Sequence, residues 1–406
     1  MKADIIIIGG GLLGTAAAYQ LAKRGAGRIV LFERQDIASQ ASSRAACLLT
    51  RARTKPAVMR MVQETYDCIA EIETLLGESL EMQSVGSVTI AASETAEKGM
   101  DALAAAAEGF GIPVERIGRE RLKELLPWIE TAPVTGAIHM PTDAFIDSAL
   151  LCNGYARAAR RLGVELRSRT AVREITHENG AVTGVVLDDG SRVEAPVVID
   201  AAGAWSNLLS MPLGIGLPMT PVRSHFWITE QNPAIFPAQE PFAVIPDARA
   251  FTRPDVGGLI IGIREPVCVS FDPHEMKDSI EHVDFSPDNG WETLSQVAEL
   301  FEPFFPAIRD TGIAHYVAGP SCYVPDAMFV VGPSSRLKGF FAATGCCGGG
   351  VACGGGIGRL VAELVMGTEP FVDPAPFCPE RFGEVDPFDP AFQKRCADAR
   401  SNKKGG

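Results

Sequence analysis

Three glycines near the beginning of the chain have the spacing of a loop that binds phosphate groups. Gly9, Gly11 and Gly14 follow directly after the β-branched run Ile5–Ile8. Such a run predicts a parallel strand that is buried on both faces. Gly9 would allow a tight turn out of the strand, Gly11 would let a pyrophosphate approach the backbone, and Gly14 would let the next helix pack closely. The first N–H groups of that helix would then face the phosphates.

A carboxylate at the end of the next apolar segment completes this pattern. Residues 16–24 have a helical composition, residues 28–32 predict a second strand, and Glu33 follows. An acid at this point accepts hydrogen bonds from a ribose diol and disfavours a 2′-phosphate, which argues against NADP. A glycine turn alone is weak evidence. The succession of strand, loop, helix, strand and acid predicts a Rossmann-type βαβ unit that binds the ADP half of FAD or NAD.

Three further segments are rich in small residues. Residues 37–47 form a small, polar stretch soon after the acid, and the apolar residues 197–199 lead to a glycine turn at Gly203. Residues 340–344 lead to a run of glycines and then to an apolar helix, which we expect to begin near Gly355. Glycines allow the backbone to lie close to a flat ligand, and the N-terminus of the helix would favour negative charge on it.

Together these segments resemble the flavin-contacting segments of the D-amino-acid-oxidase-like superfamily of FAD-dependent oxidoreductases. Within it, the chain is most similar to the flavoprotein domain of sarcosine and dimethylglycine dehydrogenases, and to sarcosine oxidases. The resemblance includes Pro221–Glu230 and Val317–Asp326, which look like the family's "HQY-VTE" strand and "NGP-x-x-x-TPD" segment. It implies FAD as the cofactor. The residues that the glycine pattern and the resemblance assign to FAD are Gly9, Gly11, Leu12, Leu13, Gly14, Glu33, Arg34, Ser42, Ser43, Arg44, Ala45, Ala46, Val172, Ala202, Gly203, Trp205, Gly345, Cys346, Cys347, Gly348, Gly349, Gly350 and Val351.

The resemblance also implies an α/β fold, α+β overall, with a Rossmann-type FAD-binding domain and a mixed-sheet substrate domain of the D-amino-acid-oxidase type. A small antiparallel meander is expected over residues 170–193. We expect the FAD-binding domain to comprise residues 1–80, 146–215 and 319–385, the substrate domain to comprise residues 81–145 and 216–318, and residues 386–406 to form a charged C-terminal tail.

Some positions depart from the family pattern. Arg44 stands where the dehydrogenases have the His that attaches FAD covalently, and Gly319 stands where sarcosine oxidases have a linking Cys. Cys322 is three residues away from that position. We therefore predict non-covalent FAD. Ala352 replaces the family Lys that binds the substrate carboxylate, so another group must bind a carboxylate if the substrate has one.

Two side chains are candidates for substrate chemistry. His225 lies in an apolar strand, and a matching His lies near the flavin in the resembled dehydrogenases. It would bind the substrate or help to deprotonate an amine, and the alternative is a hydrogen-bonded core histidine. The resemblance assigns a carboxylate-binding role to an Arg of the segment containing Arg51 and Arg53, and Arg51 aligns best. The alternative for Arg51 is a solvated loop residue. We interpret Cys346 and Cys347 as small residues of the flavin loop rather than as a redox dithiol.

The resemblance implies an FAD-dependent amine or amino-acid oxidase or dehydrogenase. It would oxidise the C–N bond of a secondary or tertiary amine or amino acid, N-methylated or cyclic, by hydride transfer to flavin N5. Oxygen or an electron carrier would accept the electrons. Two alternatives stay open: an FAD-dependent 2-hydroxyacid or polyol dehydrogenase, and a flavin-holding subunit of a larger oxidoreductase complex.

Composition narrows the classes further. A chain of 406 residues favours two domains, and a net charge of −13 argues against nucleic acid or anionic lipid as partners. The ten cysteines lack zinc spacing, so we expect reduced thiols in a cytoplasmic protein. No apolar run is long enough to predict a membrane span. We expect no metal site and interpret His274 and His282 as residues of a solvated acidic loop.

Overall fold

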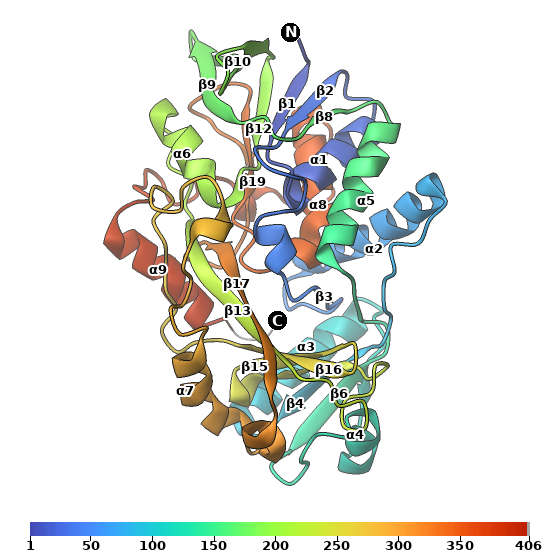
Figure 1. Cartoon of the computed structure of the whole chain (residues 1–406). Helices are drawn as coiled ribbons and strands as arrows, with labels where there is room; N and C mark the ends of the chain where they lie inside the picture. Colours follow the sequence, from blue (N-terminus) through green and yellow to red (C-terminus); the bar gives the residue numbers. More distant parts are fainter. Residues whose placement is uncertain (404–406) are drawn as a thin grey trace.

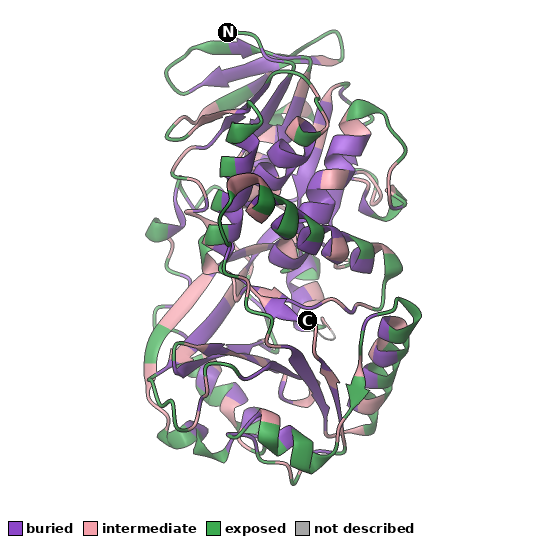
Figure 2. Ribbon diagram, turned by 90° about the vertical axis from the view of Figure 1, so that its right-hand side faces the viewer, coloured by how far each residue is buried: buried purple, intermediate pink, exposed green. Residues whose placement is uncertain are grey.

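The computed structural model describes residues 1–403. The chain forms two regions, each built on one large sheet, and segments distant in the sequence alternate between them (Figure 1). Buried residues concentrate along both sheets and along the helices that cover them (Figure 2). Within residues 1–403, no helix has both the length and the apolar character needed to cross a membrane.

The first region contains the predicted βαβ unit at the centre of a six-stranded sheet. β1 pairs in parallel with β2 on one side and with β12 on the other. The β18–β19 pair is antiparallel. In spatial order the strands are β18 (Val330–Pro333), β19 (Phe340–Thr344), β12 (Val197–Asp200), β1 (Ile5–Ile8), β2 (Ile29–Phe32) and β8 (Glu165–Arg167).

The two faces of this sheet are buried against different layers. Ile5 and Ile7 point to a core formed with four helices, whereas Ile6 and Ile8 point to a core formed with a small second sheet. This alternation explains why an unbroken apolar run was needed in β1. The helices are α1 (Leu12–Lys23), α2 (Pro56–Leu76), α5 (Ser148–Arg161) and α8 (Gly350–Met366). The second sheet is the predicted meander, in the order β11 (Arg192–Glu194), β10 (Ala181–Leu187) and β9 (Val172–Glu178), and α6 (Ser206–Ser210) follows β12.

Helix α8 begins earlier than the sequence predicted. Its first residue is Gly350, and the glycines that we expected to precede the helix lie inside it. A Cβ on Gly356 would lie 2.3 Å from Cα of Met61 in α2, and a Cβ on Gly358 would lie 2.7 Å from the carbonyl carbon of Ala16 in α1. These glycines are therefore contact points at which α8 crosses two helices, rather than parts of the loop.

The second region is an eight-stranded mixed sheet. All its pairings are antiparallel except β4–β14. In spatial order the strands are β17 (Ile313–Tyr323), β13 (Thr220–Thr229), β16 (Gly258–Ile263), β15 (Ala250–Asp255), β14 (Phe242–Ile245), β4 (Ser87–Ala91), β6 (Gly136–Met140) and β5 (Glu115–Arg116). A short pair, β3 (Leu48–Leu49) with β7 (Ala144–Phe145), is separate. The remaining helices of this region are α3 (Glu94–Gly109), α4 (Arg119–Leu125) and α7 (Trp291–Phe301). The fold is the α/β arrangement of two domains that the sequence predicted.

The end of the described chain differs from the expected tail. Residues Pro390–Ser401 form helix α9, which packs beside β13 and β17 (Figure 1). Asp389 caps the helix by accepting a hydrogen bond from the N–H of Phe392, and Phe392 and Cys396 are buried. The prediction of a charged tail over 386–406 was wrong for this helix, and residues 404–406 lie outside the described residues. The expected domain boundary at 318/319 falls inside β17.

Candidate active site

A cavity of about 890 Å³ runs from the carboxyl end of β1 to strands β13 and β17. Nearly all the residues that the sequence assigned to FAD lie around it, although they come from separate parts of the chain. The exceptions are Gly14 and Ser43, which are not among the lining residues. The assigned residues that line the cavity are Gly9, Gly11, Leu12, Leu13, Glu33, Arg34, Ser42, Arg44, Ala45, Ala46, Val172, Ala202, Gly203, Trp205, Gly345, Cys346, Cys347, Gly348, Gly349, Gly350 and Val351.

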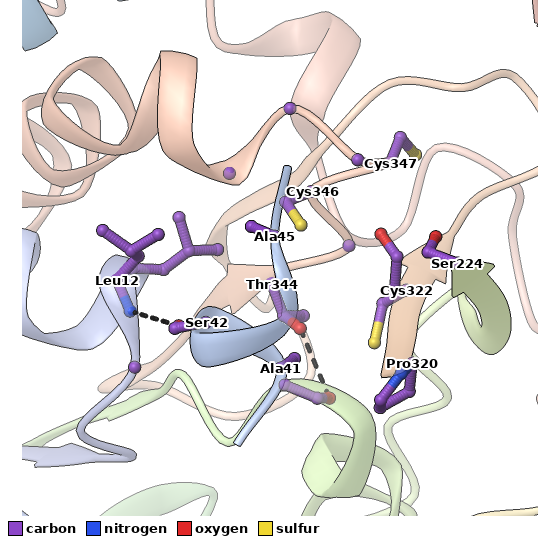
Figure 3. A pocket seen from close by; sticks show the side chains of 18 of the residues that line it. Leu12, Ala41, Ser42, Ala45, Ser224, Pro320, Cys322, Thr344, Cys346 and Cys347 are labelled. Carbon is purple, nitrogen blue, oxygen red and sulfur yellow. Dashed lines mark hydrogen bonds between the residues drawn. The ribbon is translucent and has the colours of Figure 1, made fainter. Parts of the chain in front are cut away.

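The glycine loop after β1 is fixed by close backbone contacts. Gly9 has φ +108°, and a Cβ there would lie 2.4 Å from the carbonyl oxygen of Ala201. A Cβ on Gly14 would lie 2.0 Å from the carbonyl oxygen of Gly9, so Gly14 acts through packing although it is outside the cavity. The N–H of Leu12 donates to Oγ of Ser42 at 3.0 Å (Figure 3). The start of α1 is thus tied to the small polar segment that follows Glu33.

Glu33 is held at the wall of the cavity by backbone donors. Its Oε2 accepts a hydrogen bond from the N–H of Gly10 at 2.6 Å, and its Oε1 accepts one from the N–H of Gln35 at 2.7 Å. A carboxylate has further lone pairs, which suits it to accept a ribose diol as well. Beside it, the guanidinium of Arg34 lies 4.3 Å from the ring centroid of Trp205, and burial lowers the pKa of Arg34.

The second glycine run forms a tight loop before α8. Gly345 and Gly348 have φ values of +61° and +74°, and the N–H of Cys347 donates to the carbonyl oxygen of Cys322 at 2.9 Å. No side chain caps α8 at Gly349, so the first N–H groups of the helix are available to a ligand in the cavity. Burial raises the pKa of both Cys346 and Cys347, which leaves these thiols protonated at neutral pH. Their small size, rather than thiolate chemistry, fits the loop.

The side chain of Arg44 lies directly against Gly319. A Cβ built on Gly319 would lie 2.8 Å from Cβ of Arg44, so β17 and the segment around Arg44 touch directly. The thiol of Cys322 lies nearby in the lining, and burial raises its pKa well above the usual value. A thiol that stays protonated is a poor nucleophile.

The imidazole of His225 is buried, although His225 is among the residues that line the cavity. Side chains alternate across a strand, and the preceding residue Ser224, which pairs with Gly319 of β17, is one of the lining residues drawn in Figure 3. The side chain of His225 has no exposed surface; Nδ1 lies 3.0 Å from the hydroxyl of Tyr316 and Nε2 lies 3.2 Å from Oε1 of Glu265. Burial, with the positive charges of Arg400 and Arg223, lowers its pKa to about 3. This geometry agrees with the alternative of a hydrogen-bonded core histidine.

Arg51 is not among the residues that line the cavity. Its Nε donates to the carbonyl oxygen of Thr142 at 3.0 Å, its Nη1 donates to Gln63 at 2.9 Å, and its guanidinium lies 3.7 Å from the ring centroid of Tyr66. The guanidinium therefore ties β3 and α2 to the 140s loop. Arg53, two residues further along the chain, does line the cavity.

Several lining residues were missed by the sequence reasoning. Ser224 could have been found from the alternation in β13. The others depend on segments that only the fold brings together: Tyr323, Arg264, Arg400 and Lys403. Within residues 1–403, no group of three or more His, Cys, Asp or Glu side chains is arranged to hold a metal ion.

The cavity fits FAD by its own features. Gly9 and Gly14 leave no room for a side chain. Backbone N–H groups at the starts of α1 and α8 face a common space. The carboxylate of Glu33 is fixed by hydrogen bonds where a ribose would lie. The eight-stranded sheet, through strands β13 and β17, covers the other end of that space. A dinucleotide-binding sheet combined with such a covering sheet defines a two-domain flavoprotein of the oxidoreductase class.

The comparisons with known proteins agree with this class. Residues 4–364 match the family model described as "DAO: FAD dependent oxidoreductase", and the chain belongs to this family. It is 29% identical, over 93% of its length, to 4-methylaminobutanoate oxidase (formaldehyde-forming) of Paenarthrobacter nicotinovorans, of which it covers 45%. It is 27% identical, over 91% of its length, to mitochondrial sarcosine dehydrogenase of Homo sapiens, of which it covers 40%. The chain thus spans less than half the length of these relatives.

Solved structures show the same fold. The crystal structure of L-proline dehydrogenase from P. horikoshii superposes with a TM-score of 0.82 and 24% identity, over 95% of this chain and 99% of that one. The resemblance to sarcosine and dimethylglycine dehydrogenases that the sequence suggested is confirmed.

Proposed function

We propose that this protein oxidises the C–N bond of a secondary or tertiary amine or amino acid, with FAD bound non-covalently in the cavity. The observation that carries the proposal is the shared cavity. It joins the nucleotide-binding loop of α1 to the glycine loop of α8, and strands β13 and β17 close its other end. Its relatives include proteins named for the oxidation of 4-methylaminobutanoate and sarcosine.

Each part of the chain has a distinct task in this proposal. The start of α1 binds the diphosphate, and Glu33 binds the ribose of the adenosine half. The start of α8 stabilises negative charge that develops on the flavin. Strands β13 and β17 exclude water and hold the substrate. FAD, when bound, accepts the hydride that leaves the carbon next to nitrogen, and the resulting imine hydrolyses in water.

The environment of His225 favours an amine over an alcohol as substrate. Oxidation of an alcohol needs a general base for the O–H proton, and a histidine is the usual base. His225 is the only histidine among the described lining residues, and its imidazole is fully buried with a pKa of about 3. We propose that His225 and Arg51 position the strands and loops around the site rather than touch substrate.

Two details of the proposal concern the state of the cofactor and the setting of the protein. Arg44 and Gly319 replace the family's linking residues, which supports a flavin that is not covalently attached. All ten cysteines are free thiols, which supports a reducing, cytoplasmic setting. Reoxidation of the reduced flavin by air or by a redox dye would distinguish oxygen from an electron carrier as the acceptor.

Anaerobic titration tests the proposed reaction. The purified flavoprotein is mixed with N-methylated and cyclic amino acids, with the corresponding amines, and with 2-hydroxy acids, while the flavin absorption band is followed. Bleaching by amines or amino acids, with release of the carbonyl product, supports the proposal. Bleaching only by hydroxy acids would replace it with alcohol oxidation, and no bleaching by any compound would favour a flavin-holding subunit. Acid precipitation that leaves the flavin in the pellet would contradict non-covalent binding.

A further inference from the structure

The segment that follows α9 enters the cavity beside the glycine loop of α8. Lys403 lines the cavity, and its Nζ donates to the carbonyl oxygen of Cys347 at 3.2 Å. From the position that a Cβ on Gly348 would occupy, this Nζ is 3.7 Å away and the hydroxyl of Tyr323 is 2.8 Å away. An ammonium group therefore reaches the loop that cradles the flavin, from an element that the sequence predicted to be a tail.

Arg400 reaches the same place from the last turn of α9. Its Nη1 donates to the hydroxyl of Tyr323 at 3.3 Å, and only 7% of the residue is exposed. Its Nε is buried and has no hydrogen-bond partner. A buried guanidinium N–H without an acceptor is costly. The side chain of Arg400 therefore brings positive charge to the wall of the cavity.

Two further arginines face the same end of the cavity. Arg53 follows β3, and Arg264 follows β16; both line the cavity. Together with burial, the positive charges of Arg53, Arg264 and Arg400 lower the pKa of Lys403 to about 8. Four side chains from three separate parts of the chain thus bring positive charge to one place, in a protein whose net charge is −13.

No carboxylate of the described lining is free to neutralise Arg400 or Lys403. Glu33 and Asp326 are the acidic lining residues. Glu33 belongs to the nucleotide end, where it accepts the two backbone hydrogen bonds described above. Asp326 accepts hydrogen bonds from Nε of Arg381 at 2.8 Å and from Nη2 at 2.9 Å. Glu265, which is near Arg400, is engaged with Arg223 through both of its oxygens.

We propose that Arg400 and Lys403, with Arg53, bind the carboxylate of an amino-acid substrate next to the α8 loop. This inference rests on the proposed function and narrows its substrate class to amino acids. A carboxylate balances positive charge that the diphosphate of FAD, at the other end of the cavity, does not reach. The family's usual lysine position is Ala352 in this chain, so α9 and the residues after it take over the task.

A ligand pair that differs only in charge tests the proposal in the complete flavoprotein. Pyrrole-2-carboxylate is a flat analogue of a cyclic amino acid that cannot be oxidised easily, and pyrrole-2-carboxamide is its neutral counterpart. Each is titrated against the bound flavin, whose absorption spectrum reports occupation of the cavity. The variants are Lys403→Met, Lys403→Arg and Arg400→Gln. The control is Lys394→Met, because Lys394 lies on the exposed side of α9 and pairs with Asp398.

We expect Lys403→Met to weaken binding of the carboxylate by about 10-fold or more, the effect of one lost charge-assisted hydrogen bond. Binding of the carboxamide, flavin content and reduction by dithionite should not change. Lys403→Arg should retain most of the affinity, Arg400→Gln should lose it, and Lys394→Met should match the unaltered protein. Equal affinity of Lys403→Met for the carboxylate, equal losses for both ligands, or no carboxylate binding by the unaltered protein would each overturn the proposal.

The outcomes separate this inference from the proposed reaction. Lysine-dependent carboxylate binding without flavin reduction by any amine would contradict amine oxidation but support the anion site. Rapid reduction by amines that carry no carboxylate, with no preference for amino acids, would support amine oxidation and contradict the anion site.

Discussion

Two glycines of α8 provide a matched test of how this helix is packed. Gly354 and Gly356 lie in the same helix, and the same substitution to alanine has opposite expected effects. No neighbouring atom lies within 4 Å of a Cβ built on Gly354. A Cβ on Gly356 would lie 2.3 Å from Cα and 2.7 Å from the carbonyl oxygen of Met61. Because these are backbone atoms of α2, the contact cannot be relieved by a side-chain rotation.

The magnitudes follow from helix propensity and packing. Alanine in place of glycine inside a helix stabilises by about 1 kcal/mol, so Gly354→Ala should be more stable than the unaltered protein. Gly356→Ala gains the same amount but forces α8 and α2 apart, at about 3 kcal/mol or more. Its net loss is therefore about 2 kcal/mol or more. For a chain of 406 residues, each kcal/mol corresponds to about 1 °C in Tm.

Thermal unfolding of both variants, with and without added FAD, measures this difference. We expect Tm of Gly354→Ala to rise by about 1 °C and Tm of Gly356→Ala to fall by about 2 °C or more. Because α8 also carries the flavin loop, Gly356→Ala should release FAD more readily, whereas Gly354→Ala should not. Equal Tm changes for the two variants would refute the close crossing of α8 and α2.

Other variants test the nucleotide site, the core histidine and the lysine. Glu33→Ala removes an acceptor of two backbone hydrogen bonds and should weaken FAD binding to the apoprotein about 10- to 100-fold, measured by fluorescence titration. The control Asp36→Ala, at an exposed neighbouring carboxylate, should leave FAD binding unchanged. Equal losses of FAD affinity in the two variants would contradict the role of Glu33. His225→Gln should lower the free energy of unfolding in urea by about 1–3 kcal/mol but change kcat/KM less than about 10-fold. A loss of about 1,000-fold in kcat/KM, in a variant that stays folded, would restore a catalytic role for His225. Lys403 is charged below its pKa of about 8 and neutral above it, so the Kd of pyrrole-2-carboxylate should rise as pH increases through that value, and this rise should be absent in Lys403→Met. The neighbouring titratable groups do not produce such a step. Burial raises the pKa of Tyr323, Cys346, Cys347 and Cys353, burial lowers the pKa of Arg264 only to about 10, and the pKa of Arg400 lies above its usual value. Arg53 is a further charged neighbour of Lys403.

The nucleotide half of the site was predictable from the sequence because its signal is local. Gly9, Gly11 and Glu33 lie within one βαβ unit, and each residue type is required by backbone geometry that the unit always has. The flavin loop also has a local signal, because Gly345 and Gly348 adopt positive φ, a conformation that glycine reaches without strain. The start of α8 was misplaced because glycine is a poor helix former, and only the crossing with α2 shows why Gly356 is there.

The substrate half of the site was decided by tertiary structure. An alternating strand does not say which of its faces meets the flavin, so His225 was placed in the site and Ser224 was not. An irregular segment does not say which of two arginines points inward, so Arg51 was preferred to Arg53.

The sequence by itself determined the βαβ unit and the residues of its phosphate loop, because these depend on contacts between residues close along the chain. The choice of FAD over NAD came from the resemblance of several distant segments to one family. The folded chain alone decided what faces the substrate. Arg53, Arg264, Arg400 and Lys403 come from distant segments, and no local pattern connects them. Their convergence depends on how α9 packs against β13 and β17, which is a property of long-range packing rather than of residue spacing.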